Sequence, residues 1–330
     1  MARPKVVITH WVHDEVIQLL EQSCIVITNY SRRTFSRDEI LRQCRDAEAL
    51  LAFMPDRVDQ EFLDNCPKLK VIAAALKGFD NFDVTACARR GIVFSYVQDL
   101  LTGPTAELAV ALLLGIGRNI MSGDRLVRGG RFAGWRPILY GTGLAGSTVG
   151  LVGMGAIGQA IADRLKPFAC HLLYADPREL GTEKEDRLGL AHYPLGDLLV
   201  RSDFILVTAP LTPETQHLIN RSSLALLKPG ACLVNVGRGS VVDEAAVAEA
   251  LASGRLAGYA ADVYEFEDWG RCGRPLGIYP ALLAMPDKTL FTPHLGSAVD
   301  SARKEIALEA ASAILSVLND DLSAGAVNRD

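Results

Sequence analysis

One glycine-rich segment, Gly153-Met154-Gly155-Ala156-Ile157-Gly158, has the residue types and spacing that could hold a pyrophosphate. An apolar run precedes it and a helical pattern follows it, which is the context that a dinucleotide-binding turn requires. The first glycine permits a tight turn, the second lets the backbone approach the phosphates, and the third lets the helix pack closely on the strand. The N-terminus of the helix would then face the anion. The segment therefore predicts a dinucleotide site.

An acidic residue stands where the ribose of such a dinucleotide would be recognised. Asp176 ends the next apolar run, 176 − 158 = 18 positions after Gly158. Its carboxylate can accept hydrogen bonds from ribose hydroxyls and would repel a 2′-phosphate, so the residue favours NAD over NADP. Arg178 could offset part of that repulsion, and the sequence therefore leaves some use of NADP open.

Three polar segments follow later apolar runs, each at a place where a strand is expected to end. They are NVGRG at 235–239, DVYEFE at 262–267 and PHLGS at 293–297. Taken singly, Arg238 could be a surface ion-pair partner, Glu267 a solvated loop acid and His294 a core histidine. Taken together they offer a fixed cation for an anionic substrate and a His–Glu pair for proton transfer.

Composition and charge exclude several classes of protein. The chain has 330 residues, 34 basic and 39 acidic, and its net charge of −5 argues against a nucleic-acid partner. The longest apolar run, 108–116, is too short for a membrane span, and the first residues do not resemble a signal peptide. Seven scattered cysteines without a CxxC pair predict free thiols in a reducing cytoplasm and no metal site.

The elements that must position these residues alternate in two series. Strands are expected at 6–9, 25–28, 49–53, 71–75 and 92–97, with helices such as 13–23 and 37–45 between them. A helix over 105–118 precedes the second series, whose strands are expected at 149–153, 170–176, 203–209, 231–236, 257–263 and 289–294, before a last helix over 298–318. This alternation predicts an α/β fold with two doubly wound parallel sheets, and the length suggests about two domains.

Over nearly its full length the sequence resembles the D-isomer-specific 2-hydroxyacid dehydrogenase family. By that resemblance Arg238 binds the substrate, Glu267 orients the histidine, and His294 is the acid–base group. The resemblance also implies a Rossmann NAD-binding domain, residues 100–294, inserted into a flavodoxin-like substrate domain of residues 1–99 and 295–330.

The same resemblance implies NAD as the cofactor and a homodimer as the assembly. The dimer contact would lie near the helix that begins at about residue 105. The residues expected at the cofactor are Gly153, Gly155, Ala156, Ile157, Gly158, Asp176, Pro177, Pro210, Thr105, Val236, Asp262 and Gly296.

A narrower resemblance is to the phosphite dehydrogenases within this family. It is carried by the stretches AFMPDRV at 52–58, LKGFDNFD at 76–83, residues 135–144 and EFEDW at 265–269, and it implies substrate contacts from Lys77, Gly78, Met54, Trp135, Tyr140 and Ser297. Phosphite near neutral pH is largely a dianion, and two cations, Arg238 and Lys77, match its charge better than one. At 4 Å and an effective dielectric constant of about 20, each pair of unit charges contributes about 4 kcal/mol before desolvation. We therefore expect oxidation of phosphite to phosphate by NAD, with His294 as the base for the attacking water.

Two other functions are compatible with the same residues. A conventional 2-hydroxyacid dehydrogenase acting on glyoxylate, hydroxypyruvate or lactate needs the same Arg238, Glu267 and His294. An NAD-sensing corepressor resembling the C-terminal-binding proteins could retain these residues too, although Lys77 would have no purpose in it. NADH formation with phosphite, against NADH consumption with 2-oxo acids, distinguishes the two enzymes.

Overall fold

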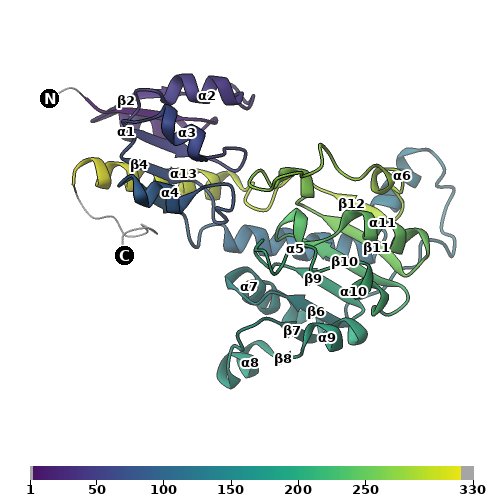
Figure 1. The fold of residues 1–330 in the computed structure, drawn as a ribbon. Coiled ribbons are helices and arrows are strands. Elements are labelled where there is room, and N and C mark those ends of the chain that lie inside the picture. Colours follow the sequence, from purple (N-terminus) through teal and green to yellow (C-terminus); the bar gives the residue numbers. More distant parts are fainter. Residues whose placement is uncertain (1–2, 321–330) are drawn as a thin grey trace. The chain divides into compact units, whose positions relative to one another are not determined.

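The computed structural model describes residues 3–320, and the chain divides into two compact units, each built on one parallel sheet (Figure 1). Unit 1 comprises Met1–Leu101, Trp269–Cys272 and Ser297–Asp330, and unit 2 comprises Thr102–Asp268 and Gly273–Gly296. The two-sheet α/β fold predicted from the alternating pattern is confirmed.

Unit 1 holds a five-stranded sheet in the order β2-β1-β3-β4-β5. Its strands are β1 (Lys5–Ile8), β2 (Ile25–Thr28), β3 (Ala49–Ala52), β4 (Val71–Ala74) and β5 (Val93–Tyr96). Its helices are α1 (Asp14–Glu21), α2 (Arg37–Cys44), α3 (Gln60–Asn65), α4 (Val84–Arg89) and α13 (Asp300–Leu318). This strand order is the flavodoxin-like one, in which the winding direction changes between β1 and β3.

Successive strand residues in unit 1 pack on opposite faces, as the pleat of a strand requires. Val6 and Ile8 lie in the core formed with α1 and α13, whereas Val7 lies in the core formed with α2, α3 and α4. The C-terminal helix α13 therefore covers, together with α1, one face of a sheet formed by N-terminal residues, and α2, α3 and α4 cover the other face.

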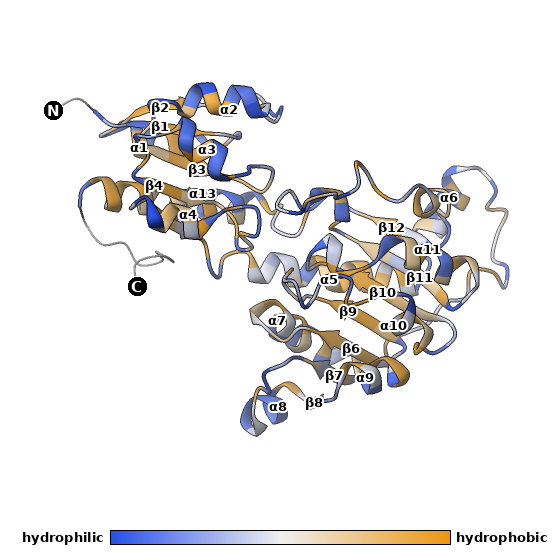
Figure 2. Ribbon diagram, in the orientation of Figure 1, coloured by the Kyte–Doolittle hydropathy of each residue, from blue (hydrophilic) through white to orange (hydrophobic). Residues whose placement is uncertain are grey.

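Unit 2 holds a seven-stranded sheet in the order β12-β11-β10-β9-β6-β7-β8. Its strands are β6 (Thr148–Val152), β7 (His171–Ala175), β8 (Leu190–His192), β9 (Phe204–Val207), β10 (Ala231–Asn235), β11 (Leu256–Ala261) and β12 (Thr289–Phe291). The winding direction changes between β6 and β9. Figure 2 shows these strands as the apolar layer of the unit, in agreement with the near-continuous apolar runs from which they were predicted.

Helices cover both faces of this sheet as well. One face packs against α5 (Thr102–Gly117) and α7 (Ala156–Leu165), and the other against α9 (Leu195–Arg201), α10 (Arg221–Ala225), α11 (Glu244–Ala252) and α12 (Pro280–Leu283). The unit also holds α6 (Ile120–Arg128), α8 (Thr182–Leu188) and the short 3-10 turns η1 (Lys166–Phe168), η2 (Gly239–Val241) and η3 (Glu265–Glu267).

The predicted strands run past the observed ones at their carboxyl ends. Residues such as Asp176, Val236 and His294 belong to predicted apolar runs, yet the structure places them in the loops just after β7, β10 and β12. Strand β8 was not predicted, because its three residues are too few to show a periodic pattern. The helix expected over 105–118 spans Thr102–Gly117, and the last helix begins at Asp300.

Within residues 3–320, no single helix is long and apolar enough to cross a membrane. Helices α5 and α6 together reach that length and composition, but they are bent by 65° at the break between them. Helix α5 is apolar as a core helix is, and its residues Ala106, Ala109 and Leu113 are fully buried.

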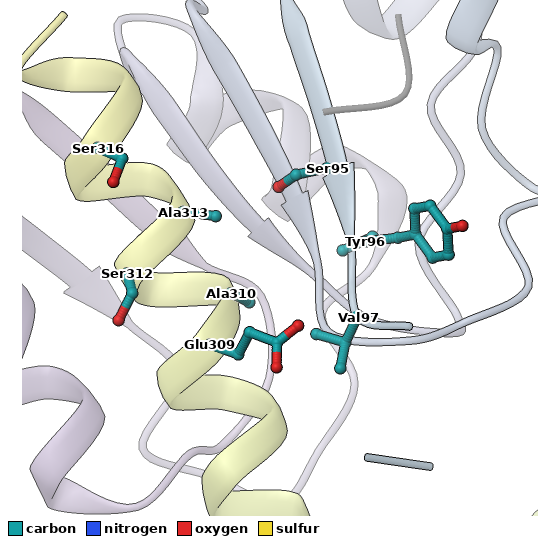
Figure 3. A pocket seen from close by; sticks show the side chains of 9 residues that line it. Ser95, Tyr96, Val97, Glu309, Ala310, Ser312, Ala313 and Ser316 are labelled. Carbon is teal, nitrogen blue, oxygen red and sulfur yellow. The ribbon is translucent and has the colours of Figure 1, made fainter. Parts of the chain in front are cut away.

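A cavity of about 190 Å³ lies in unit 1 between the edge strand β5 and helix α13 (Figure 3). Ser95, Glu309 and Ser312 are among its lining residues, and Figure 3 shows the Glu309 carboxylate beside Val97. Its lining includes none of the residues predicted to bind substrate or cofactor.

Candidate active site

The glycine-rich segment forms a tight turn between β6 and α7. Gly153 has φ +95°, and a Cβ there would lie 2.7 Å from the backbone nitrogen of Ala209. A Cβ on Gly158 would lie 2.4 Å from the Gly153 oxygen, whereas a Cβ on Gly155 would meet no atom within 4 Å. Gly153 and Gly158 are therefore needed for packing, while Gly155 leaves open space at the N-terminus of α7. That arrangement fits a pyrophosphate lying against the backbone.

Asp176 is joined to this turn by hydrogen bonds. Its Oδ2 accepts from the backbone nitrogen of Met154 at 2.8 Å, and its Oδ1 accepts from that of Arg178 at 2.9 Å. The carboxylate therefore holds the end of β7 against the turn. Each oxygen keeps a further lone pair with which it can accept from a hydroxyl group. Pro177, the next residue, is exposed.

The other predicted cofactor residues lie along the carboxyl edge of the same sheet. A Cβ on Gly237 would lie 2.6 Å from the Ala209 oxygen, so the loop holding Val236 packs directly on the backbone before Pro210. A Cβ on Gly296 would lie 3.1 Å from Thr105 Oγ1 and 3.3 Å from Asp262 Oδ2. Thr105, Asp262 and Gly296 are therefore grouped together.

His294 and Glu267 form a close pair, with His294 Nδ1 2.7 Å from Glu267 Oε2. Because a carboxylate only accepts hydrogen bonds, Nδ1 is the donor, and Nε2 takes no part in this pair. The side chains are 30% and 17% exposed, so the pair is accessible yet largely shielded from water. This arrangement suits a group that gives or takes one proton.

The backbone of His294 is held in an uncommon conformation by Asp262. His294 has φ +56°, in the left-handed region that non-glycine residues rarely adopt. Its backbone nitrogen donates to the Asp262 oxygen at 3.0 Å. The Asp262 carboxylate accepts from Thr292 Oγ1 at 2.6 Å and from the backbone nitrogens of Leu295 and Gly296 at 2.6 and 2.8 Å. Burial raises the pKa of Asp262 above its usual range.

Arg238 follows β10 and begins the turn η2. The fully buried Asn235 holds its loop, since Asn235 Nδ2 donates to the Arg238 oxygen at 2.9 Å and Asn235 Oδ1 accepts from the Gly237 nitrogen at 3.1 Å. Asn235 was not among the residues predicted to be functional. Its signal in the sequence is one amide side chain at the end of an otherwise apolar strand.

The predicted substrate residues Met54, Lys77, Gly78 and Ser297 belong to unit 1. Met54 follows β3, and Lys77 and Gly78 follow β4, so they lie toward the carboxyl edge of that sheet. Arg303 links the segment after β4 to Ser297, because its Nη1 donates to the Ala75 oxygen at 3.4 Å and to Ser297 Oγ at 3.3 Å. Burial lowers the pKa of Lys77 below its usual range.

Two predicted substrate residues, Trp135 and Tyr140, lie in the segment that follows α6. Both are exposed, 83% and 78%, and Asn119 Nδ2 donates to the Tyr140 oxygen at 3.3 Å, just past the C-terminal end of α5. The contact of Gly296 with Thr105 is near the opposite end of that helix. At 1.5 Å per residue, Thr105 and Gly117 are separated by about 18 Å along the helix axis. The described part of a single chain therefore places the Tyr140 backbone near the end of α5 opposite to the contact of Gly296.

Residues 110–296 match the family model of the D-isomer specific 2-hydroxyacid dehydrogenase NAD-binding domain. The chain belongs to this family. It is an NAD-binding oxidoreductase, and the glycine-rich turn and the Asp176 carboxylate have the chemistry that such a cofactor requires.

The chain is similar over nearly its whole length to several individual proteins. It is 37% identical over 99% of its length to a glyoxylate reductase of Pyrococcus furiosus, of which the match covers 96%. It resembles the TT0316 protein from Thermus thermophilus with a TM-score of 0.88 and 34% identity, covering 98% of this chain and 99% of that one. It also resembles an NADPH-dependent glyoxylate/hydroxypyruvate reductase of Sinorhizobium meliloti, solved with NADP and malonate, with a TM-score of 0.82, 28% identity, and 99% and 97% covered.

These comparisons contradict the prediction that the chain oxidises phosphite. The similar relatives are named glyoxylate reductases, and they support the alternative of a conventional 2-hydroxyacid dehydrogenase. The prediction rests on the number of positive charges near the substrate, and that number does not identify the substrate. A second cation matches a dianion, but it equally stabilises a monoanion whose carbonyl oxygen gains negative charge during reaction. Lys77 therefore does not distinguish the two substrates.

Replacing Asp176 by alanine should shift the preference of the chain from NADH toward NADPH. The variant loses the repulsion between the carboxylate and a 2′-phosphate, a cost of a few kcal/mol near a protein surface. It also loses the acceptor for Met154. We expect the ratio of the NADPH to the NADH dissociation constant, measured by fluorescence titration at fixed salt, to fall about tenfold or more.

Two further variants separate charge from turn geometry. Asp176→Asn keeps an acceptor for the Met154 nitrogen while removing the charge, so it should shift the ratio in the same direction. Asp186→Ala, at an exposed position on α8, should leave the ratio unchanged. An unchanged ratio in both Asp176 variants would show that this residue does not face the ribose.

Proposed function

We propose that the chain reduces a small 2-oxo acid such as glyoxylate or hydroxypyruvate with NADH, and oxidises the corresponding 2-hydroxy acid in reverse. The observation that carries this proposal is the His294–Glu267 pair at 2.7 Å in the same unit as Arg238 and the glycine-rich turn. The names of the similar reductases support the substrate class.

In this proposal each polar group has one task. Arg238 pairs with the substrate carboxylate, for which its planar guanidinium is suited. His294 donates a proton from Nε2 to the carbonyl oxygen as that oxygen gains negative charge, and Glu267 stabilises the imidazolium through Nδ1. The bound dinucleotide supplies the hydride. The balanced reaction is 2-oxo acid + NADH + H⁺ → 2-hydroxy acid + NAD⁺.

The remaining residues would hold the two ligands. Gly153, Gly155, Ala156, Ile157 and Gly158 would hold the pyrophosphate, Asp176 and Pro177 the ribose, and Pro210, Thr105, Val236, Asp262 and Gly296 the nicotinamide half. Lys77, Gly78, Met54 and Ser297 are proposed as further substrate-binding residues. We propose a substrate domain of residues 1–99 and 295–330 and an NAD domain of residues 100–294. These ranges correspond closely to unit 1 and unit 2, except that Trp269–Cys272 belong to unit 1.

The test is the change in NADH absorbance at 340 nm with glyoxylate, hydroxypyruvate and pyruvate. We expect NADH to be consumed with at least one of them, and the matching 2-hydroxy acid to reduce NAD. NADH formation from phosphite without turnover of any 2-oxo acid would overturn the proposal. NAD binding without turnover of any of these compounds would also contradict it.

Replacing His294 by alanine should abolish most turnover while leaving cofactor binding intact. The loss of a positioned acid typically costs about 10²- to 10⁴-fold in rate, whereas the residues proposed to hold the pyrophosphate and the ribose, 153–158 and Asp176, belong to other segments. We expect kcat for glyoxylate to fall by that factor and the NADH dissociation constant to change less than about threefold. His171→Ala, at an exposed position at the start of β7, is the matched control, and near-normal turnover of His294→Ala would refute the acid assignment.

Replacing Lys77 by alanine should raise KM for the 2-oxo acid far more than KM for NADH. A hydrogen bond to a charged group contributes about 1.5 to 3 kcal/mol, which corresponds to roughly a 10-fold to 100-fold change. Steady-state kinetics with each substrate varied in turn measure this, with exposed Lys68→Ala as the control. Equal losses for both ligands would place Lys77 outside the substrate site.

A homodimer in the cytoplasm completes the proposal. Support for the dimer comes from the segment after α6, where Phe132, Trp135, Ile138, Leu139 and Tyr140 are each at least 43% exposed. Such a group of apolar side chains is typical of a contact surface. Support for the location comes from seven cysteines that are all free thiols.

Light scattering tests the dimer. The wild-type chain should have twice the mass of one chain, and Trp135→Ser with Tyr140→Ser should weaken the association. A single-chain mass for the wild type at micromolar concentration would contradict the dimer.

A further inference from the structure

A second histidine–carboxylate pair lies in unit 2, on residues that the proposed reaction does not use. His217 Nε2 is 2.8 Å from Glu265 Oε2, and the side chains are 33% and 9% exposed. The backbone nitrogen of His217 donates to the Ser240 oxygen at 2.7 Å. His217 itself has φ +50°. This residue therefore connects the loop after β9 both to η2, which follows Arg238, and to η3, which contains Glu267.

Glu265 is held from its other side by a second buried carboxylate. Glu265 Oε1 accepts from the backbone nitrogen of Glu244 at 3.2 Å, and the Glu265 nitrogen donates to Glu244 Oε1 at 3.0 Å. Glu244 Oε2 accepts from the Tyr279 nitrogen at 2.8 Å. Every carboxylate oxygen of the two residues thus has a partner. Burial raises the pKa of Glu244 above its usual range.

The two turns held by this network also touch one another directly. A Cβ on Gly239 would lie 1.8 Å from the Tyr264 carbonyl carbon, so only glycine permits this approach of the two backbones. The Ser240 nitrogen donates to Asp268 Oδ2 at 2.7 Å. Gly239 directly follows Arg238, and Asp268 directly follows Glu267. The contact therefore joins the backbones that carry these two side chains.

A buried polar network of this kind is a poor source of stability. Removing charges from water costs several kcal/mol per ion, and apolar side chains of similar volume often stabilise a core as well or better. What a fully satisfied network provides is one defined arrangement of the groups that it holds. Here those groups are the turns on which the candidate substrate cation and the partner of His294 are placed.

We infer that His217 and Glu265 are positioning residues for the reaction, acting through Glu267 and Arg238 without touching the substrate. The pair fixes η3 so that the Glu267 carboxylate meets His294 Nδ1, and fixes the segment after Arg238. This inference rests on the proposed function, because it concerns the same proton transfer and the same substrate cation.

The test compares Glu265→Gln and His217→Gln with wild type in the NADH-dependent reduction of glyoxylate. Misplacement of a catalytic group by about 1 Å can cost on the order of 100-fold in rate. We expect kcat to fall about 10-fold to 100-fold in each variant, while the NADH dissociation constant changes less than about twofold. Glu249→Gln is the matched control, since Glu249 lies on the same helix as Glu244 and pairs with Arg221 at the surface.

A double-variant cycle distinguishes positioning from a general loss of folded protein. For the effect on kcat that passes through Glu267, adding Glu265→Gln to Glu267→Gln should lower kcat less than about threefold further, because coupled residues are not additive. The effect through Arg238, the candidate substrate cation, is measured separately as a rise in KM for glyoxylate. A full additional loss in that background would overturn the inference, as would unchanged kcat in folded Glu265→Gln. If Glu265→Gln does not fold, His217→Gln is combined with Glu267→Gln in the same way, because His217 is more exposed than Glu265. Absence of turnover by the wild-type chain would instead overturn the proposed function, and this inference with it.

Discussion

The candidate site depends on one buried carboxylate, that of Asp262. Three short hydrogen bonds to it, from Thr292, Leu295 and Gly296, close the chain around His294 and force this residue into a left-handed backbone conformation. Strain of this kind persists only where surrounding contacts over-determine the conformation. Because the imidazole leaves the backbone at that angle, Nδ1 reaches Glu267, and the geometry of the pair follows from the loop after β11.

The parallel sheet explains why residues far apart in the sequence meet here. In unit 2 the loops after β6, β7, β9, β10, β11 and β12 all lie at the carboxyl edge of the sheet, and together they carry most of the candidate site residues of this unit. The approach of Gly237 to Ala209, and of Gly239 to Tyr264, shows how tightly these loops are packed. The site is thus built from backbone contacts as much as from its polar side chains, and the His217–Glu265 pair belongs to that framework.

The sequence predicted the two parallel sheets and most of their strands, because buried parallel strands are continuous apolar runs bounded by turn residues. It also predicted Arg238, Glu267 and His294 as a set, since each follows such a run. It could not show Asn235, Glu244 and Glu265 as supporting residues, because a hydrogen bond across the fold leaves no local pattern. Nor could it specify the substrate, because Lys77 suits a dianion and a 2-oxo acid alike.

The left-handed backbone of His294 sets stability and activity against each other at one position. Relative to glycine, an ordinary side chain in this conformation costs roughly 1 to 2 kcal/mol, so a glycine at 294 would relieve strain and at the same time remove the imidazole. A search for thermostable variants guided by backbone strain alone would favour that change. The residue that contributes most to the proposed chemistry is thus also one whose backbone conformation costs stability.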